Sequence, residues 1–296
     1  MILPIILFFA GIIVATIYFI VNQRRAEQRN IKFREEIKND FEQLRKDLPN
    51  IIEDGIPYLK NKKKQSIIKK GLAYLIDHKY EFALELFKQY VNNFSLDDSE
   101  KAAILNFIGI AYGENKEYEK SLEAFNKALE IDPRLAQALE NKGVALYELG
   151  RFQEVLEASE TAIKLNPKLA HAWDNKGGAL YKLGRFQEAL SAHEKAISID
   201  PNKAEFWSNK GAGLIKLDRL QDALKAFDKA IEINPNLSVT RYNIACIYSL
   251  TREKAKALEH LSNAISLGVK NKKRAKTDED FKWLLEDEEF KRLTAD

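Results

Sequence analysis

The sequence predicts an all-α protein, a superhelical α-solenoid of about six stacked helical hairpins with a capping helix at its C-terminal end. Two observations support this fold class. Proline recurs every 34 residues, at Pro133, Pro167, Pro201 and Pro235. Only 13 glycines and 7 prolines occur among 296 residues, a composition that favours long regular helices. A period of this length is typical of units that bury their apolar faces against their neighbours.

Small residues follow the same period, which predicts that the two helices of each unit cross closely. Glycine recurs at Gly109, Gly143, Gly177 and Gly211, and alanine recurs at Ala128, Ala162, Ala196, Ala230 and Ala264. Large apolar side chains such as Trp173 and Trp207 are expected to fill the space between neighbouring units. The turn between the two helices reads LGRF in two units, where Gly150 and Gly184 can adopt the left-handed conformation that ends a helix.

The 34-residue period and the segment from Ala172 to Pro201, AWDNKGGALYKLGRFQEALSAHEKAISIDP, resemble the tetratricopeptide repeat family. The resemblance implies a repeat array over residues 64–271. Its units are 64–101, 102–135, 136–169, 170–203, 204–237 and 238–271. Apolar residues from Phe281 to Leu293 predict the capping helix within 272–296, with Thr277 and Asp280 at its start.

The N-terminal residues predict a transmembrane anchor over residues 1–21. Residues 2–21 carry no charge, and as a helix they would span about 30 Å, the thickness of a bilayer's hydrocarbon. A cleaved signal peptide is the alternative, but no basic residue precedes the run and no small-x-small site follows it. Arg24, Arg25 and Arg29 follow the run, so we expect a single-pass membrane protein whose array faces the cytoplasm.

A charged helical connector is predicted at residues 22–63. Apolar residues at Ile37, Phe41, Leu44 and Leu48 form one narrow helical stripe. The stripe is expected to pack on the array, and pairing with a second copy as a short coiled coil is the alternative. A lysine cluster from Lys60 to Lys70 is either a solvated helix face or a contact with anionic lipid.

Charge and rare residues argue against several classes of function. The net charge is only +3 and no domain is strongly basic, so no nucleic-acid partner is expected. Cys246 is the only cysteine and is predicted to be a small buried side chain. The four histidines lack a metal-ligand spacing, so no metal and no cofactor is expected. Because no phosphate loop or nucleophile elbow is present, the chain is predicted not to be an enzyme.

A binding site is predicted on the first helices of the array, which line the concave groove of a tetratricopeptide solenoid. An asparagine stands two residues before the repeated glycine in three units, and two residues before Ala245, which takes the place of the glycine, in a fourth. A carboxamide complements one peptide unit, and the resemblance implies that such a row can hold an extended backbone. A solvated, frequently used asparagine is the alternative. The predicted site residues are Asn141, Asn175, Asn209 and Asn243, together with Glu140, Asp174, Tyr147, Tyr181, His171 and Glu205.

These features predict a membrane-anchored adaptor that binds a partner protein or an extended peptide in the groove. The acidic residues at groove positions would repel an acidic C-terminal tail, so partners of that kind are not expected. The alternative is a structural or assembly subunit of a larger membrane complex. The sequence does not identify the partner or the oligomeric state.

Overall fold

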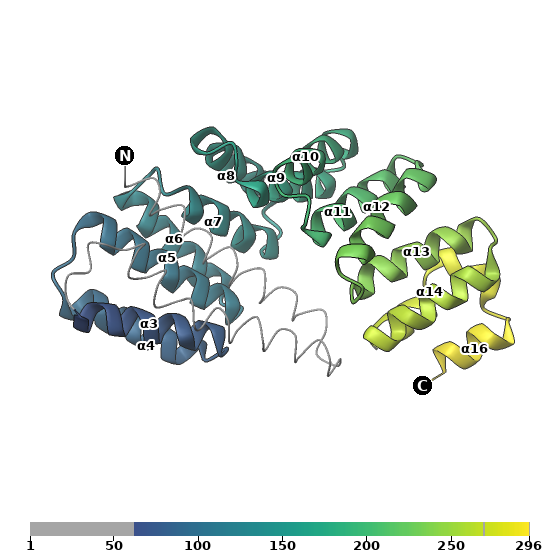
Figure 1. Ribbon diagram of the computed structural model, residues 1–296, viewed down its shortest axis with the longest axis horizontal. Helices are drawn as coiled ribbons and strands as arrows, with labels where there is room; N and C mark the ends of the chain where they lie inside the picture. The colour runs from purple at the N-terminus through teal and green to yellow at the C-terminus, as the bar shows by residue number, and fades with distance from the viewer. Residues whose placement is uncertain (1–61, 269, 296) are drawn as a thin grey trace. The chain divides into compact units, whose positions relative to one another are not determined.

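The computed structural model describes residues 62–268 and 270–295 of the chain. The described part is all-helical and contains no strand, which confirms the predicted helical repeat solenoid (Figure 1). It divides into two compact units, of which the first holds residues 62–168 and the second holds residues 169–295. Each unit is described by itself below.

Unit 1 consists of three helical hairpins. Its helices are α3 (Lys62–Ile76), α4 (Tyr80–Asn93), α5 (Asp98–Glu114), α6 (Tyr118–Ile131), α7 (Ala136–Glu148) and α8 (Phe152–Leu165). A continuous apolar core joins the first two hairpins, in which Phe87 stacks on Phe107 with ring centroids 5.6 Å apart.

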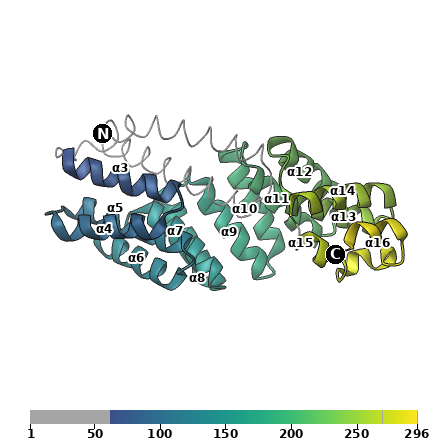
Figure 2. The same cartoon turned by 90° about the horizontal axis from the view of Figure 1, so that it is seen from below.

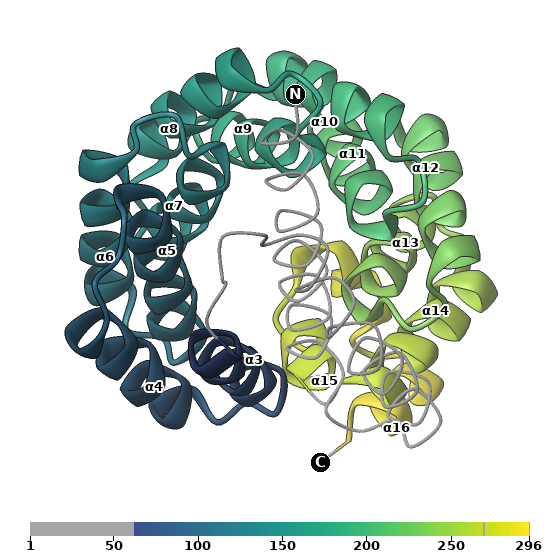
Figure 3. The same ribbon diagram turned by 60° about the vertical axis from the view of Figure 1, so that its left-hand side comes forward.

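Unit 2 also consists of three hairpins, followed by a C-terminal cap. Its hairpin helices are α9 (Ala170–Lys182), α10 (Phe186–Ile199), α11 (Ala204–Lys216), α12 (Leu220–Ile233), α13 (Ser238–Leu250) and α14 (Lys254–Leu267). In Figure 3 the first helices α9, α11 and α13 lie on one side of this unit, and the second helices lie on the other. We call the side formed by α9, α11 and α13 the first-helix face.

The turn inside each hairpin requires a residue with positive φ. Gly150 (φ 74°) and Gly184 (φ 76°) fill this position in two units, as the sequence predicted. Lys116, Asp218 and Arg252 adopt the same left-handed conformation at the equivalent positions, with φ between 57° and 63°. The backbone of these three residues is strained, because a residue with a Cβ disfavours positive φ.

The turn between hairpins explains the repeated Asp-Pro and Asn-Pro steps. The Asp132 side chain accepts a hydrogen bond from the backbone N–H of Arg134 (3.0 Å), two residues later. Asn166, Asp200 and Asn234 make the same bond in the following turns. Proline stands between donor and acceptor, where its missing N–H removes no hydrogen bond and its fixed φ suits the turn.

Three of the repeated glycines, Gly109, Gly177 and Gly211, lie where an aromatic ring of the second helix crosses the first. A Cβ added at Gly109 would lie 2.4 Å from the Phe125 ring, and one added at Gly211 would lie 2.4 Å from the Phe227 ring. Only glycine allows this separation. The predicted close crossing therefore exists in these hairpins. The side chain that packs against the glycine is an aromatic ring from the second helix of the same hairpin.

The extra four residues of the first repeat lengthen α5. This helix has 17 residues, whereas α7, α9, α11 and α13 have 13 each. Asp97 starts it with a capping box, accepting a hydrogen bond from the backbone N–H of Glu100 (2.8 Å), whose side chain caps the Asp97 N–H in return. The helix therefore begins four residues before the predicted repeat boundary at residue 102.

The predicted single capping helix is divided into three short helices. They are α15 (Lys270–Ala275), the 3-10 helix η1 (Glu279–Leu284) and α16 (Glu288–Thr294), seen beside α13 and α14 in Figure 2. Asp278, not Thr277, is the N-cap of η1, and Asp287 is the N-cap of α16. Two strong caps within ten residues interrupt what the apolar pattern suggested was one helix. Phe281, Leu284 and Phe290 are fully buried against the last hairpin.

The structure corrects the predicted localisation. No helix within residues 62–268 and 270–295 is long and apolar enough to cross a membrane. The longest of them, α5, has 17 residues and carries charged side chains near both ends. The predicted transmembrane segment at residues 2–21 and most of the connector, up to residue 61, lie outside the described residues. The prediction of a single-pass membrane protein facing the cytoplasm is therefore withdrawn.

Candidate functional site

The ten predicted site residues are divided between the two units. Glu140, Asn141 and Tyr147 lie on α7 of unit 1. The other seven lie in unit 2, on first helices at equivalent repeat positions: His171, Asp174, Asn175 and Tyr181 on α9, Glu205 and Asn209 on α11, and Asn243 on α13.

In unit 1 the asparagine of the row is a buried contact between repeats. The Asn141 Nδ2 donates to Oδ1 of Asn106 on α5 (3.1 Å), and both side chains are buried. Asn141 is only 6% exposed, which leaves little of its carboxamide for a partner. Its place in the structure favours the stacking of two repeats over the binding of a peptide.

Two more predicted residues of α7 take part in packing. The Tyr147 ring meets the Phe152 ring edge-on at 5.3 Å, across the turn of its own hairpin. Glu140 is 9% exposed, and burial raises the pKa of its carboxyl to about 7. A carboxyl group with this pKa changes charge near neutral pH, because the low-polarity surroundings disfavour its ionised form.

In unit 2 the asparagine of the row belongs to a hydrogen-bonded cluster of three side chains. The Asn209 Nδ2 donates to both carboxylate oxygens of Asp174 on the preceding first helix, at 3.2 and 3.0 Å. The His193 Nδ1 lies 2.7 Å from Oδ1 of the same carboxylate. Because a carboxylate can only accept, this nitrogen carries the proton and donates. We call these residues the Asp174 cluster.

His193 was not among the predicted site residues, although a signal for it exists in the repeat register. It stands 34 residues from Phe227 and 34 residues from Ser159, which itself follows Phe125 by 34. The His193 ring lies on Gly177 as the Phe rings lie on their glycines, and a Cβ at Gly177 would be 2.5 Å from Cε1. His193 is a polar ring where other repeats have phenylalanine. Because it is buried, it requires a hydrogen-bond partner, and Asp174 is that partner.

The two asparagine contacts follow one rule. Asn141 bonds to a residue 35 positions earlier, and Asn209 does the same. The acceptor is an amide in one case and a carboxylate in the other. Asparagine in this row therefore ties one first helix to the preceding one, which sequence spacing alone did not reveal.

The remaining predicted residues of unit 2 differ in exposure. The His171 ring meets the Phe206 ring edge-on at 5.2 Å, and burial, with a smaller effect of Lys203, lowers its pKa. The Tyr181 ring meets the Phe186 ring edge-on at 5.4 Å. Asn175, Glu205 and Asn243 are partly exposed, as is Asn209. The first-helix face thus keeps three of the predicted asparagines within reach of solvent.

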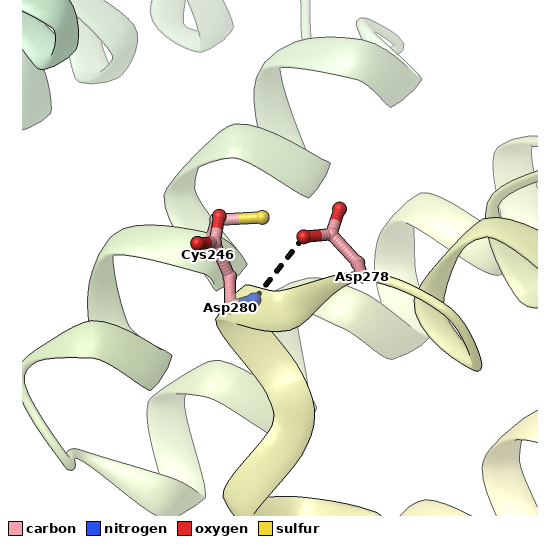
Figure 4. A group of neighbouring side chains, drawn as sticks. All are labelled: Cys246, Asp278 and Asp280. Atoms are coloured by element: carbon pink, nitrogen blue, oxygen red, sulfur yellow. Dashed lines mark hydrogen bonds between the residues drawn. The ribbon is translucent and has the colours of Figure 1, made fainter.

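A second polar cluster lies where the cap meets α13. Cys246, Asp278 and Asp280 bring three potential metal-ligand atoms within 4.8 Å of one another (Figure 4). Asp278 already accepts hydrogen bonds from the Tyr242 hydroxyl (2.7 Å) and from the backbone N–H of Asp280 (3.2 Å). Burial, and then the two carboxylates, raise the pKa of the Cys246 thiol far above its usual range. The hydrogen bonds of Asp278 join α13 to the start of η1, so we assign the cluster to the attachment of the cap.

Comparison with protein families finds repeats in four stretches of the chain. Models described as tetratricopeptide repeats match residues 102–135, 136–169 and 204–237, and a TPR repeat model matches residues 177–214. The chain contains tetratricopeptide repeats. Their presence indicates a role in protein–protein interaction or as a scaffold.

Solved structures of MamA have a similar fold. One from Desulfovibrio magneticus RS-1 matches with a TM-score of 0.51 at 22% identity, covering 59% of this chain and 97% of the other. A MamA RS-1 double mutant matches with the same score and identity, covering 59% and 96%. At this identity the likeness concerns the fold alone. A comparison with curated protein sequences found no match.

Proposed function

We propose that the chain is a protein-interaction scaffold that binds an extended segment of a partner protein on the first-helix face of unit 2. The proposal rests mainly on the partly exposed asparagines of α9, α11 and α13, Asn175, Asn209 and Asn243, which recur at one repeat position on successive first helices. Asparagine can both donate to and accept from a peptide backbone, so such a row suits a partner in extended conformation.

The structure favours unit 2 over unit 1 for this role. Asn141 is buried and bonded to Asn106, whereas Asn209 remains partly exposed although its Nδ2 is bonded to Asp174. Within the described residues, no hydrogen bond involves the Asn209 Oδ1. In our proposal this oxygen accepts a hydrogen bond from a backbone N–H of the partner.

Small side chains next to the row support close approach of a partner backbone. Gly178 and Ala212 stand three residues after Asn175 and Asn209, about one helical turn along the same face, and both are partly exposed. Neither carries a side chain that would hold a bound strand away from the helix. In α13 the same position is Cys246, which is buried beside the cap.

We propose no catalytic role for the chain. The Asp174–His193 pair has the hydrogen bond of an acid–base pair, but the His193 side chain is only 2% exposed. A substrate could not reach its second ring nitrogen without opening the hairpin. The prediction that the chain is not an enzyme is kept as part of this proposal.

The test uses the purified full-length chain as bait for proteins of the source cell, followed by chemical crosslinking. A triple variant, N175A, N209A and N243A, removes the partly exposed row. The control variant N263A makes the same change on α14, one of the second helices. We expect capture to fall at least about tenfold in the triple variant and to persist in the control, as loss of several hydrogen bonds predicts.

Equal capture by the triple variant and the wild type would contradict the proposed surface. The size of the native complex then separates the two functions. A stable complex of fixed size that survives the triple substitution would favour the structural subunit, whereas a monomer with exchanging partners agrees with the scaffold.

A further inference from the structure

We infer that the first-helix face of unit 2 selects partner segments that carry a cationic side chain, and that Asp174 receives this cation. The inference rests on the proposed function and adds the chemistry of the ligand. It follows from the geometry of the Asp174 cluster and from two choices of residue that stacking of the repeats does not require.

The Asp174 carboxylate is held in one orientation and still reaches the surface. The Asn209 Nδ2 holds it from α11 and the His193 Nδ1 holds it from α10, while its side chain stays 16% exposed. His193 is buried and therefore keeps the carboxylate fixed from the protein side. The second oxygen, Oδ2, receives only the Asn209 bond among the described residues, so it can accept from a ligand.

The negative charge is not needed to join the repeats. Unit 1 has two residues equivalent to Asp174 in the repeat register, Asn106 and Glu140. The neutral Asn106 accepts the same bond from Asn141 at 3.1 Å and is only 4% exposed, while Glu140 is an acid that is 9% exposed. An amide therefore satisfies the contact between repeats. Asp174 adds a charge and greater exposure at the same place.

The histidine is not needed for packing either. Phe125 and Phe227 occupy its position in other hairpins, and a Cβ added at Gly109 or Gly211 would lie 2.4 Å from their rings, against 2.5 Å from the His193 ring for one at Gly177. His193 keeps this packing and adds the Nδ1–H group, which donates to Asp174. His193, which departs from the phenylalanine of other repeats, and Asn209 therefore act on one carboxylate, which stays partly exposed.

The charged groups near this site are of both signs. Glu205 on α11 is partly exposed and adds a second negative charge to the first-helix face. Lys203, the N-cap residue of α11, is a positive charge close enough to His171 to lower its pKa. Lys176 lies over the Trp173 ring and Lys210 pairs with Glu194 (2.9 Å), so both ammonium groups are held by other side chains. Lys182 and Lys216 stand at the C-terminal ends of their helices, and Lys182 is eight residues, about 12 Å, from Asp174. Hydrogen bonds between ions are roughly twice as strong as neutral ones, which gives a Lys or Arg side chain the advantage.

The test is selection from a display library of random linear 12-residue peptides with the full-length chain as target. We expect the wild-type chain to enrich peptides that contain Lys or Arg. The variant D174N keeps an amide acceptor like that of Asn106 and should fold normally, and we expect it to bind an enriched peptide about fivefold or more weakly. The control D228N makes the same change on the exposed face of α12 and should leave affinity unchanged.

A double-mutant cycle then assigns the contact. Replacing the peptide's basic residue by Gln should weaken binding to the wild type about as much as D174N does, and should cause no further loss in D174N. Enriched peptides without a basic preference, or unchanged affinity in D174N, would overturn the inference while leaving peptide binding intact. Failure of the wild type to enrich any peptide would instead remove the proposed function itself.

Should D174N not fold, two measurements on the wild type decide the question. The affinity of the Lys or Arg peptide must exceed that of its Gln counterpart, and this difference must shrink as salt rises. Equal affinities, or a difference that salt does not change, would contradict a cation at Asp174.

Discussion

The imidazole ring of His193 lies directly on the backbone of Gly177, so close that a Cβ at this glycine would stand 2.5 Å from the ring. In three other hairpins the same contact joins Gly71 to Phe87, Gly109 to Phe125 and Gly211 to Phe227. A hairpin with such a ring therefore requires glycine at the crossing. Replacing one of these glycines by alanine tests whether the ring packs there.

Gly211→Ala is expected to destabilise the protein by about 2 kcal/mol, because the new Cβ would overlap the fully buried Phe227 ring. Gly213→Ala on the same helix is the control. A Cβ there meets nothing within 4 Å, so this variant is expected to gain roughly 0.5–1 kcal/mol from helix propensity. Chemical denaturation of both variants measures the difference. Similar stability changes in the two would refute the close crossing.

Lys116→Gly is expected to stabilise the protein by about 0.5–1 kcal/mol, since Lys116 is exposed and held at φ 63°. The reverse change, Gly150→Ala, places a Cβ at φ 74° and should cost about 1 kcal/mol. Thermal unfolding of the two variants provides the measurement. A Lys116→Gly variant that melts below the wild type would show that its turn carries no strain.

Glu140 predicts a pH dependence of stability. Its pKa is about 7 in the folded protein and 4.5 in the reference state, so the folded protein binds more protons between these values. The free energy of unfolding should therefore fall as pH rises from about 4.5 to about 7. Glu140→Gln should equal the wild type at pH 4.5 and exceed it by roughly 2–3 kcal/mol at pH 8. Parallel stability curves for both proteins would contradict the raised pKa.

Cys246 is expected to be almost inert towards thiol reagents in the folded protein. Its burial and its raised pKa leave very little thiolate at pH 8. Labelling with iodoacetamide should be at least about a hundredfold slower in native protein than in denaturant. Fast native labelling would mean that the cap opens readily, because η1 lies against this part of α13.

Sequence patterns predicted the hairpins well and the site only partly. The repeated glycines and prolines reflect backbone requirements, such as the close helix contact at Gly211 and the turn at Pro133, and the structure confirms them. It also confirms the positive φ of the turn glycines Gly150 and Gly184. The asparagine contacts depend on side-chain direction between neighbouring helices. Spacing therefore found Asn141 and Asn209 but could not show that each bonds to a residue 35 positions earlier.

The Asp174–His193 bond was missed for a related reason. Its two residues lie on different helices, 19 positions apart, and neither belongs to a known motif. Only comparison of each repeat position across units shows that His193 replaces a phenylalanine. The cap was also misjudged, because its apolar spacing suits one helix although Asp278 and Asp287 start two separate ones.

The most direct test of the central claim is site-specific photo-crosslinking in living cells. A photoreactive amino acid replaces Ala212 on the first-helix face of α11 in one variant and the exposed Lys229 on α12 in another. The account predicts that a partner protein crosslinks through position 212 and not through position 229, and that the crosslinked residue lies in an extended segment of that partner. Crosslinks through position 229 alone would contradict it.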